Sequence, residues 1–138
     1  MKKTAKRSKK GFTLVELIVV LVILAVLAAM LVPALVGYVD KAKAEKEYQT
    51  AATVYGAAQA TITEMYGRDA ITGSGTLSKG TTGYGAQVLS LAGVDTNAVT
   101  AFSFKYGSNF IITGGKVTIN SHVYELKITN GVPSWSAT

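Results

Sequence analysis

The sequence predicts an α+β fold in which a long N-terminal helix packs on a small antiparallel β-sheet of about four strands. Two patterns predict this fold. Helical periodicity runs without a loop signal from about Phe12 to Tyr66, and short runs that alternate apolar with polar residues follow from Val99 onward. The expected parts are an apolar helical half at residues 12–39, an amphipathic helical half at residues 40–66 and a globular head at residues 67–138.

The first half of the helix is apolar enough to span a membrane. No charged side chain lies between Leu17 and Val39, and at about 1.5 Å per residue this stretch can cross a bilayer core of about 30 Å. An ordinary secretory signal is less favoured, because the apolar run exceeds the usual length of about 7–15 residues. A plain one-pass anchor is less favoured because Glu16 stands at the start of the stretch and Pro33 stands inside it.

The formal net charge of +6 is concentrated at the N-terminus. Six basic residues fall within the first ten positions: Lys2, Lys3, Lys6, Arg7, Lys9 and Lys10. The basic residues that remain are as many as the acidic ones, so no direct nucleic-acid binding is predicted from charge. The basic leader, which we expect to be disordered before processing, predicts a cytoplasmic N-terminus with residues 40–138 on the outer side. The chain has no cysteine, so its stability must come from packing and hydrogen bonds.

The second half of the helix carries an apolar stripe that is expected to cover the sheet. Its members recur at steps of three and four residues. They are Tyr48, Ala51, Ala52, Tyr55, Ala58, Ile62, Met65 and Tyr66. Gln59 is expected on another, polar face, and Lys43 and Glu47 are spaced for a weak surface ion pair. Gly56 is expected to weaken the helix by about 1 kcal/mol relative to alanine, and Gly67 is expected to end it.

Turn residues divide the rest of the chain. Residues 67–85 are rich in glycine, serine and threonine and predict a long surface loop. Residues 84–92 predict a short helix that ends at Gly93. The spacing of Gly75 and Gly80 is that of a phosphate-binding loop, but Thr81 stands where a lysine is needed. This segment is therefore not predicted to bind phosphate.

Two glycine-containing pairs predict hairpin turns in the sheet. These pairs are Gly114–Gly115 and Asn130–Gly131, of which the second is the stronger signal. Pro133 follows the second pair and places the last strand at an edge of the sheet, because proline cannot donate a ladder hydrogen bond.

No catalytic or metal-binding set stands out in the sequence. His122 is the only histidine and there is no cysteine, so His122 is expected at the surface or at the flank of the sheet rather than on a transition metal. Asp95 stands apart from other acidic residues and does not supply the clustered oxygens that calcium needs. We expect no enzyme activity, no cofactor and no metal.

Glu16 has two interpretations. A carboxylate at the start of a helix interacts favourably with the positive end of the helix dipole. Alternatively, cleavage after Gly11 would create a cation at the α-amino group of Phe12, which the Glu16 carboxylate of a neighbouring copy can pair with. In an apolar medium such a pair is strong and intolerant of misplacement, so it would set the register of stacked identical helices.

The stretch KKGFTLVELIVVLVILAVLAAMLVPAL resembles the class III signal of type IV prepilins and pseudopilins. The resemblance is carried by the basic leader ending at Gly11, by Phe12, by Glu16 and by Pro33. It implies a pilin-like fold, a cleaved leader at residues 1–11, and cleavage and N-methylation at Phe12 by a prepilin peptidase. It also implies extraction by a membrane platform protein with an assembly ATPase, and polymerisation into a filament. In that setting the helix bends or unwinds near Pro33, and Gly37 adds local weakness.

The resemblance predicts a structural subunit, of the major type, in a type IV pilus for adhesion, motility or aggregation. The absence of a cysteine pair favours a Gram-positive-type pilin. The subunit would be a single-pass protein of the cytoplasmic membrane before assembly and part of a surface pilus after it. The alternatives are a pseudopilin of a competence or type II secretion apparatus, and a monomeric membrane-anchored binding module.

Overall fold

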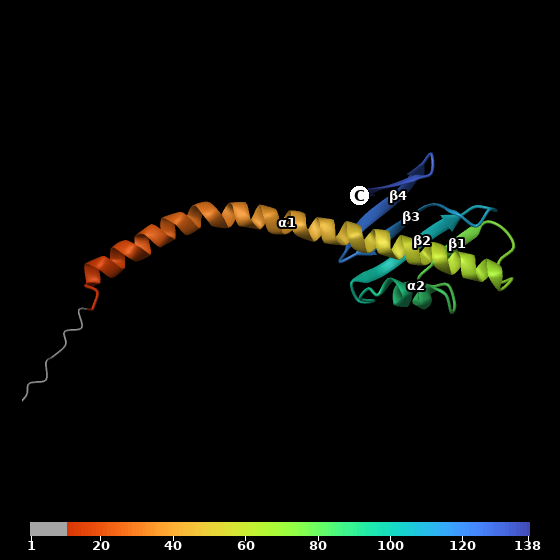
Figure 1. Cartoon of the computed structure of the whole chain (residues 1–138), viewed down its shortest axis with the longest axis horizontal. Helices are drawn as coiled ribbons and strands as arrows, with labels where there is room; N and C mark the ends of the chain where they lie inside the picture. Colours follow the sequence, from red (N-terminus) through yellow and green to blue (C-terminus); the bar gives the residue numbers. More distant parts are fainter. Residues whose placement is uncertain (1–10) are drawn as a thin grey trace, which may run out of the picture. The chain divides into compact units, whose positions relative to one another are not determined.

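The computed structural model describes residues 11–138 (Figure 1). The expected disorder of the leader falls on residues 1–10, which lie outside the described residues. The chain forms two compact units that divide between Ala42 and Lys43. Helix α1, Leu14–Gly67, belongs to both units, and its bounds agree with the helix predicted from about Phe12 to Tyr66.

Among residues 11–42 of the first unit, no other segment packs against α1. The helix continues without interruption through Pro33 and Gly37. Every residue from 11 to 42 is exposed. A helix that exposes all its faces gains nothing from internal packing. The first unit must therefore be stabilised by its surroundings.

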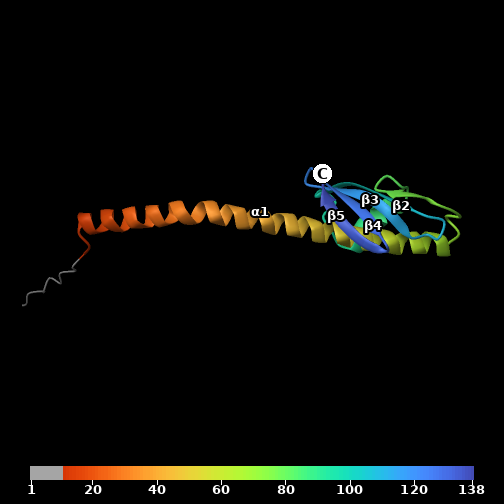
Figure 2. The ribbon, with the colours of Figure 1, turned by 90° about the horizontal axis from the view of Figure 1, so that it is seen from above.

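The second unit, residues 43–138, contains a sheet of five strands, which we call the head together with the helical segments packed on it. The strands are β1 (Gly75–Ser78), β2 (Val99–Tyr106), β3 (Ile112–Ile119), β4 (His122–Thr129) and β5 (Val132–Ala137). They lie in the order of the sequence, and each pair is antiparallel (Figure 2). The predicted α+β class with an antiparallel sheet is confirmed, with five strands instead of about four.

The strand that the sequence did not predict is β1, which lies in the segment predicted to be a surface loop. In β1, Gly75 pairs with Tyr106 and Leu77 pairs with Phe104 on β2. Leu77 is fully buried, and the Tyr106 ring occupies the space where a side chain at position 75 would stand. The loop prediction was wrong for these residues, because four residues with little strand propensity become a strand only when β2 offers them a partner.

The hairpin predicted at Gly114–Gly115 was also wrong. Both glycines lie inside β3, and the chain turns instead at Asn120 and Ser121, whose φ angles are 48° and 71°. Gly115 lies opposite Phe104, and a Cβ there would stand 2.6 Å from Cδ1 of that ring. The glycine therefore makes room for an aromatic core residue instead of forming a turn.

The second predicted hairpin is confirmed. Asn130 and Gly131 have φ angles of 52° and 80° and join β4 to β5. The Thr138 amide donates to the Val123 carbonyl at 2.9 Å, and ladder bonds alternate along an antiparallel pair. Pro133 therefore lies where an amide would point away from β4, and its missing N–H leaves the outer edge of the sheet less able to pair.

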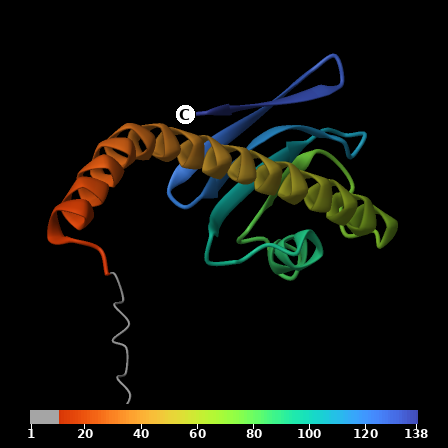
Figure 3. The same cartoon turned by 60° about the vertical axis from the view of Figure 1, so that its left-hand side comes forward.

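The second half of α1 crosses one face of the sheet and closes the core with it (Figure 3). Helix α2, Gly85–Ala92, ends at Gly93 in the left-handed conformation, as predicted. From α1 the core takes Ala51, Val54, Ala58, Ile62 and Met65, and from the sheet it takes aromatic and branched residues. Two members of the predicted stripe, Ala52 and Tyr66, are exposed. Val54 and Thr61, which were not part of the predicted stripe, are buried.

Candidate assembly site

The predicted cleavage site lies just before the helix. Gly11, Phe12 and Thr13 are not helical, and the Phe12 side chain is 78% exposed. A peptide bond in an exposed segment outside a helix can enter a peptidase active site, whereas a helical segment must first unwind. The Gly11–Phe12 bond is accessible in this structure.

Glu16 forms a capping box with Thr13. The Thr13 hydroxyl oxygen accepts the Glu16 N–H at 3.1 Å, and Glu16 Oε2 accepts the Thr13 N–H at 3.3 Å. These two bonds satisfy amides that the first helical turn leaves without partners. The Thr-x-x-Glu pattern signals this arrangement in the sequence, although no role was predicted for Thr13.

The capping box places the carboxylate beside the point where processing would create a charge. Cleavage would put the new amine on Phe12, one residue before the Thr13 N–H that Glu16 already accepts. A free amine at a helix N-terminus is disfavoured by the helix dipole and favours a nearby carboxylate. Glu16 therefore has a capping role within its own chain, and its role in subunit register stays a prediction.

The apolar surface of the first unit extends over all sides of the helix. Large apolar side chains from Phe12 to Val39 are 43–78% exposed. The helix contains a stretch long and apolar enough to cross a membrane, none of which is buried within the structure. Such a surface needs lipid or other helices around it, because a large exposed apolar patch is unstable in water.

Pro33 and Gly37 lie within this apolar surface. A Cβ at Gly37 would meet no atom within 4 Å, so nothing in the chain requires a glycine there. Pro33 removes the amide that would bond to the carbonyl of Ala29. Both residues leave room for bending, and the predicted kink or melting at these positions stays a prediction.

A polar cluster around Glu47, which was not predicted from the sequence, links α1 to the sheet. The carboxylate accepts a hydrogen bond from the Tyr124 hydroxyl, lies 3.0 Å from Nδ1 of His122 and lies 3.5 Å from Nδ2 of Asn120. The Glu47 side chain is 12% exposed. It therefore faces the sheet, and the predicted pair with Lys43 is not among the ion pairs of the structure.

Burial and hydrogen bonding act in opposite directions on Glu47. Burial raises the pKa of its carboxyl, but hydrogen bonds from Tyr124, His122 and Asn120 outweigh burial and hold the pKa below 4.5. Burial and the Glu47 carboxylate together raise the pKa of Tyr124 to about 12. His122 lies at the start of β4 with an exposed ring, which is the flank position expected for it. Within residues 11–138, no group of His, Asp and Glu side chains could hold a metal ion.

A family model described as the prokaryotic N-terminal methylation motif matches residues 6–32. The chain therefore carries the class III signal peptide of type IV pilins, which confirms the resemblance of its N-terminal stretch. Together with the α+β head, which is consistent with a pilin-like fold, this motif supports a type IV pilin-like or pseudopilin protein that is anchored in a membrane. The comparisons with curated proteins and with solved structures found no match.

Proposed function

We propose that the chain is a structural, major-type subunit of a type IV pilus that forms a surface filament for adhesion, motility or aggregation. The observation that carries the proposal is the methylation motif at residues 6–32, which leads into a helix whose first half, up to residue 42, exposes every apolar side chain. A surface of this kind suits two successive environments, lipid before assembly and neighbouring helices afterwards.

In this proposal, processing removes the positive charge with the leader. A prepilin peptidase cleaves after Gly11 and methylates the new amine of Phe12. The leader stays cytoplasmic, and residues 40–138 lie on the outer side of the membrane. The platform protein and the assembly ATPase then extract the subunit, and identical subunits bury the apolar helix in the filament.

Within the filament, Glu16 sets the register between copies. Its carboxylate pairs with the Phe12 amine of a neighbour, and the low dielectric of packed apolar helices makes an unpaired charge costly. Pro33 and Gly37 mark the segment that bends or unwinds as subunits pack.

Mass spectrometry and electron microscopy of sheared surface material test the proposal together. The expected result is long filaments made of a chain that begins at Phe12 and carries one methyl group. A chain beginning at Met1 in surface filaments would refute the processing step. Short periplasmic or envelope-spanning assemblies would identify a pseudopilin, and a monomer confined to membranes would identify an anchored binding module.

A further inference from the structure

The loop between β2 and β3 displays apolar side chains on the surface of the head. The ring of Phe110 stacks on that of Tyr66, with centroids 4.3 Å apart and an interplanar angle of 25°. Tyr66 is 53% exposed and the neighbouring Ile111 is 54% exposed. We call Tyr66, Phe110 and Ile111 the aromatic knob.

Hydrogen bonds hold the knob in one conformation. Gln59 on α1 donates from Nε2 to the Phe110 carbonyl at 2.8 Å and accepts the Ile112 N–H at 2.9 Å. The Gly107 N–H donates to the Ile111 carbonyl at 3.1 Å and closes the loop. Gln59, which was expected on a polar face of the helix, thus supports the loop that carries the knob.

The knob is built on a strained backbone. Phe110 has a φ of 62°, a left-handed conformation that bulky residues rarely adopt. In this conformation Phe110 is only half-buried and lies against exposed Tyr66. Such strain persists where surrounding bonds impose it, and it is concentrated at sites of binding and switching. A strained residue beside exposed apolar side chains makes the knob a candidate contact surface.

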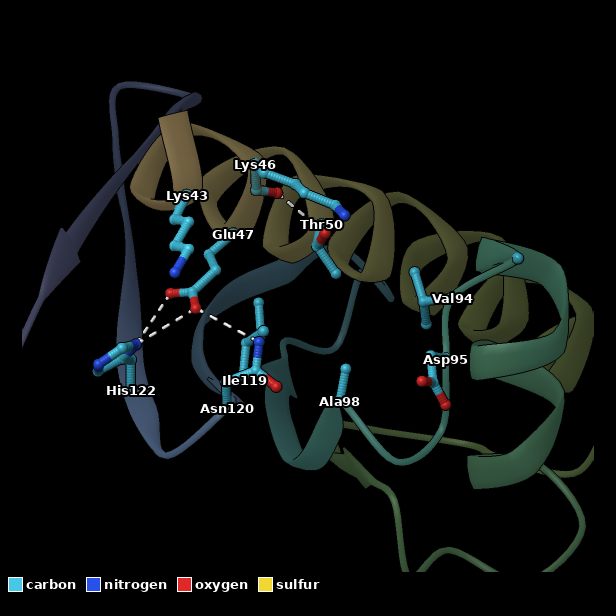
Figure 4. A pocket seen from close by; sticks show the side chains of 11 residues that line it. Lys43, Lys46, Glu47, Thr50, Val94, Asp95, Ala98, Ile119, Asn120 and His122 are labelled. Atoms are coloured by element: carbon cyan, nitrogen blue, oxygen red, sulfur yellow. Dashed lines mark hydrogen bonds and ion pairs between the residues drawn. The ribbon is translucent and has the colours of Figure 1, made fainter. Parts of the chain in front are cut away.

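A groove of about 680 Å³ lies at the other end of the head (Figure 4). Its walls come from α1, from the segment between α2 and β2, and from the turn between β3 and β4. Val94, Ala98 and Ile119 contribute apolar lining. Glu47, which lines the groove, precedes Tyr66 of the knob by nineteen residues on α1, a separation of about 28 Å along the helix axis.

Two lysines of the groove can pair with a carboxylate at the knob end. Lys43 and Lys46 line the groove, and neither makes an ion pair with another described residue. Two carboxylates also line it, but Glu47 is bonded to the sheet and Asp95 accepts the N–H of a residue in its own loop. At the knob end, Asp69 is exposed and has no ion-pair partner among residues 11–138.

We propose that the aromatic knob of one head docks into the groove of the head of a second copy of this chain, with Asp69 beside Lys43 and Lys46. The proposal rests on the filament assembly proposed above. Because the knob and the groove lie at opposite ends of the head, the contact is heterologous, and repeating it builds an open row of subunits instead of a closed dimer. Apolar side chains fill the centre of the contact, and charges at its rim select the partner.

Cysteine cross-linking in the full-length chain tests the contact without background, because the chain contains no cysteine. The test variant combines Asn109→Cys beside the knob with Ala98→Cys in the groove, and intact cells are treated with a short bis-maleimide. The expected product is a ladder of covalent multimers, because every subunit carries both halves of the contact. Each single substitution is expected to give no ladder. The same holds for Asn109→Cys combined with Thr100→Cys, an exposed site outside the groove.

A second variant removes the ring of Phe110 from the knob. In the cross-linking background, Phe110→Gly keeps the left-handed backbone without strain, and circular dichroism checks that the head is folded after the loss of a ring that packs against its core. The ladder is expected to weaken about tenfold, because buried aromatic anchors dominate such contacts. An unchanged ladder from a folded variant overturns the role of the knob.

The outcomes separate this contact from the proposed function. Filaments seen by electron microscopy without a ladder overturn the docking and leave the pilus assignment intact. A ladder from cells without filaments supports the docking and overturns the pilus assignment. A ladder of equal strength from the control pair overturns the choice of a second copy as the occupant of the groove. The same conclusion follows if the only cross-linked product has a mass that shows a different protein as the partner.

Discussion

Residues 11–42 and residues 43–138 bury their apolar side chains in opposite ways. In the first region every side chain is exposed, so its partners must lie outside the chain. In the second region the sheet and the second half of α1 share one internal core. A core tolerates different residues if volume and pattern are kept, whereas a region that an enzyme and identical copies recognise, as we propose for residues 11–42, depends on particular residues at particular positions. The family match at residues 6–32 falls in the N-terminal region and covers none of the head.

The largest expected effect comes from Glu16 in the first region. Glu16→Ala should leave cleavage and methylation at Phe12 in place and abolish filaments made of that subunit alone, because each packed copy would leave an amine unpaired in an apolar core. Mass spectrometry of membranes and electron microscopy of surface material measure the two outcomes. Filaments at normal yield would refute the register role.

Two matched variants separate register from helix capping. Glu16→Gln keeps an oxygen that can accept the Thr13 N–H but removes the charge, and Thr13→Ala removes the capping hydroxyl but keeps the charge. We expect no filaments from the first variant and filaments from the second, at a local cost of about 1 kcal/mol for the lost cap. The reverse result would assign Glu16 to capping alone.

Gly115 should give the largest effect on the stability of the head. In Gly115→Ala, the new methyl group would lie 2.6 Å from the Phe104 ring and closer still to the Ser103 carbonyl oxygen. The head is expected to lose about 2–4 kcal/mol, because neither the backbone nor the core ring can move freely. Thermal unfolding of the full chain in detergent measures the loss. Gly114→Ala, whose Cβ would stand 3.3 Å from a single carbonyl oxygen, is the milder control.

Tyr124→Phe should have a smaller effect that depends on pH. The ring stays packed, but Glu47 loses a hydrogen bond while still mostly buried, at a cost of about 1–2 kcal/mol near neutral pH. Because the pKa of Tyr124 rises from 10.0 to about 12 on folding, its contribution to stability is complete below pH 10 and is lost as the pH approaches 12.

Melting curves between about pH 8 and pH 12 test this sign. The wild-type chain should lose stability across the upper part of the range, and Tyr124→Phe should lose less. Tyr48→Phe is the matched control, since Tyr48 packs edge-on against Tyr124 at 4.8 Å. If stability falls with pH equally in the wild-type chain and in Tyr124→Phe, the loss at high pH does not come from the raised pKa of Tyr124.

Gly56 should give the smallest effect, and in the opposite direction. A Cβ there would meet no atom within 4 Å, so Gly56→Ala should stabilise the head by about 0.5–1 kcal/mol through helix propensity alone. A higher melting temperature of the full chain in detergent is expected. A more stable head combined with fewer filaments would show that position 56 lies at a contact between subunits.

The sequence predicted elements whose signals are local. Helical periodicity gave the extent of α1 to within two residues, and the glycine at position 93 marked the end of α2. Asn130–Gly131 formed its hairpin because both residues accept positive φ at low cost, and Pro133 lies at the edge where its missing amide is tolerated. Each of these signals acts within a few residues of the chain.

The predictions that were wrong concern positions whose structure depends on a residue far away in the sequence. Gly115 was interpreted as part of a turn, but the ring of Phe104 on the neighbouring strand requires a glycine inside β3. Glu47 was expected to pair with Lys43 one turn away, but Tyr124, far along the chain, supplies the donor that turns it toward the sheet. Neither partner can be identified from local spacing.

By itself, the sequence determined the class III signal, the apolar helix and the α+β class, because charge, periodicity and turn chemistry are carried by neighbouring residues. Only the tertiary structure decided that Gly75–Ser78 pairs with β2 and that Gln59 holds Phe110 in a strained, half-buried position. Strand partners and side-chain conformations depend on contacts between segments that are distant in the sequence. No local sequence pattern specifies these contacts.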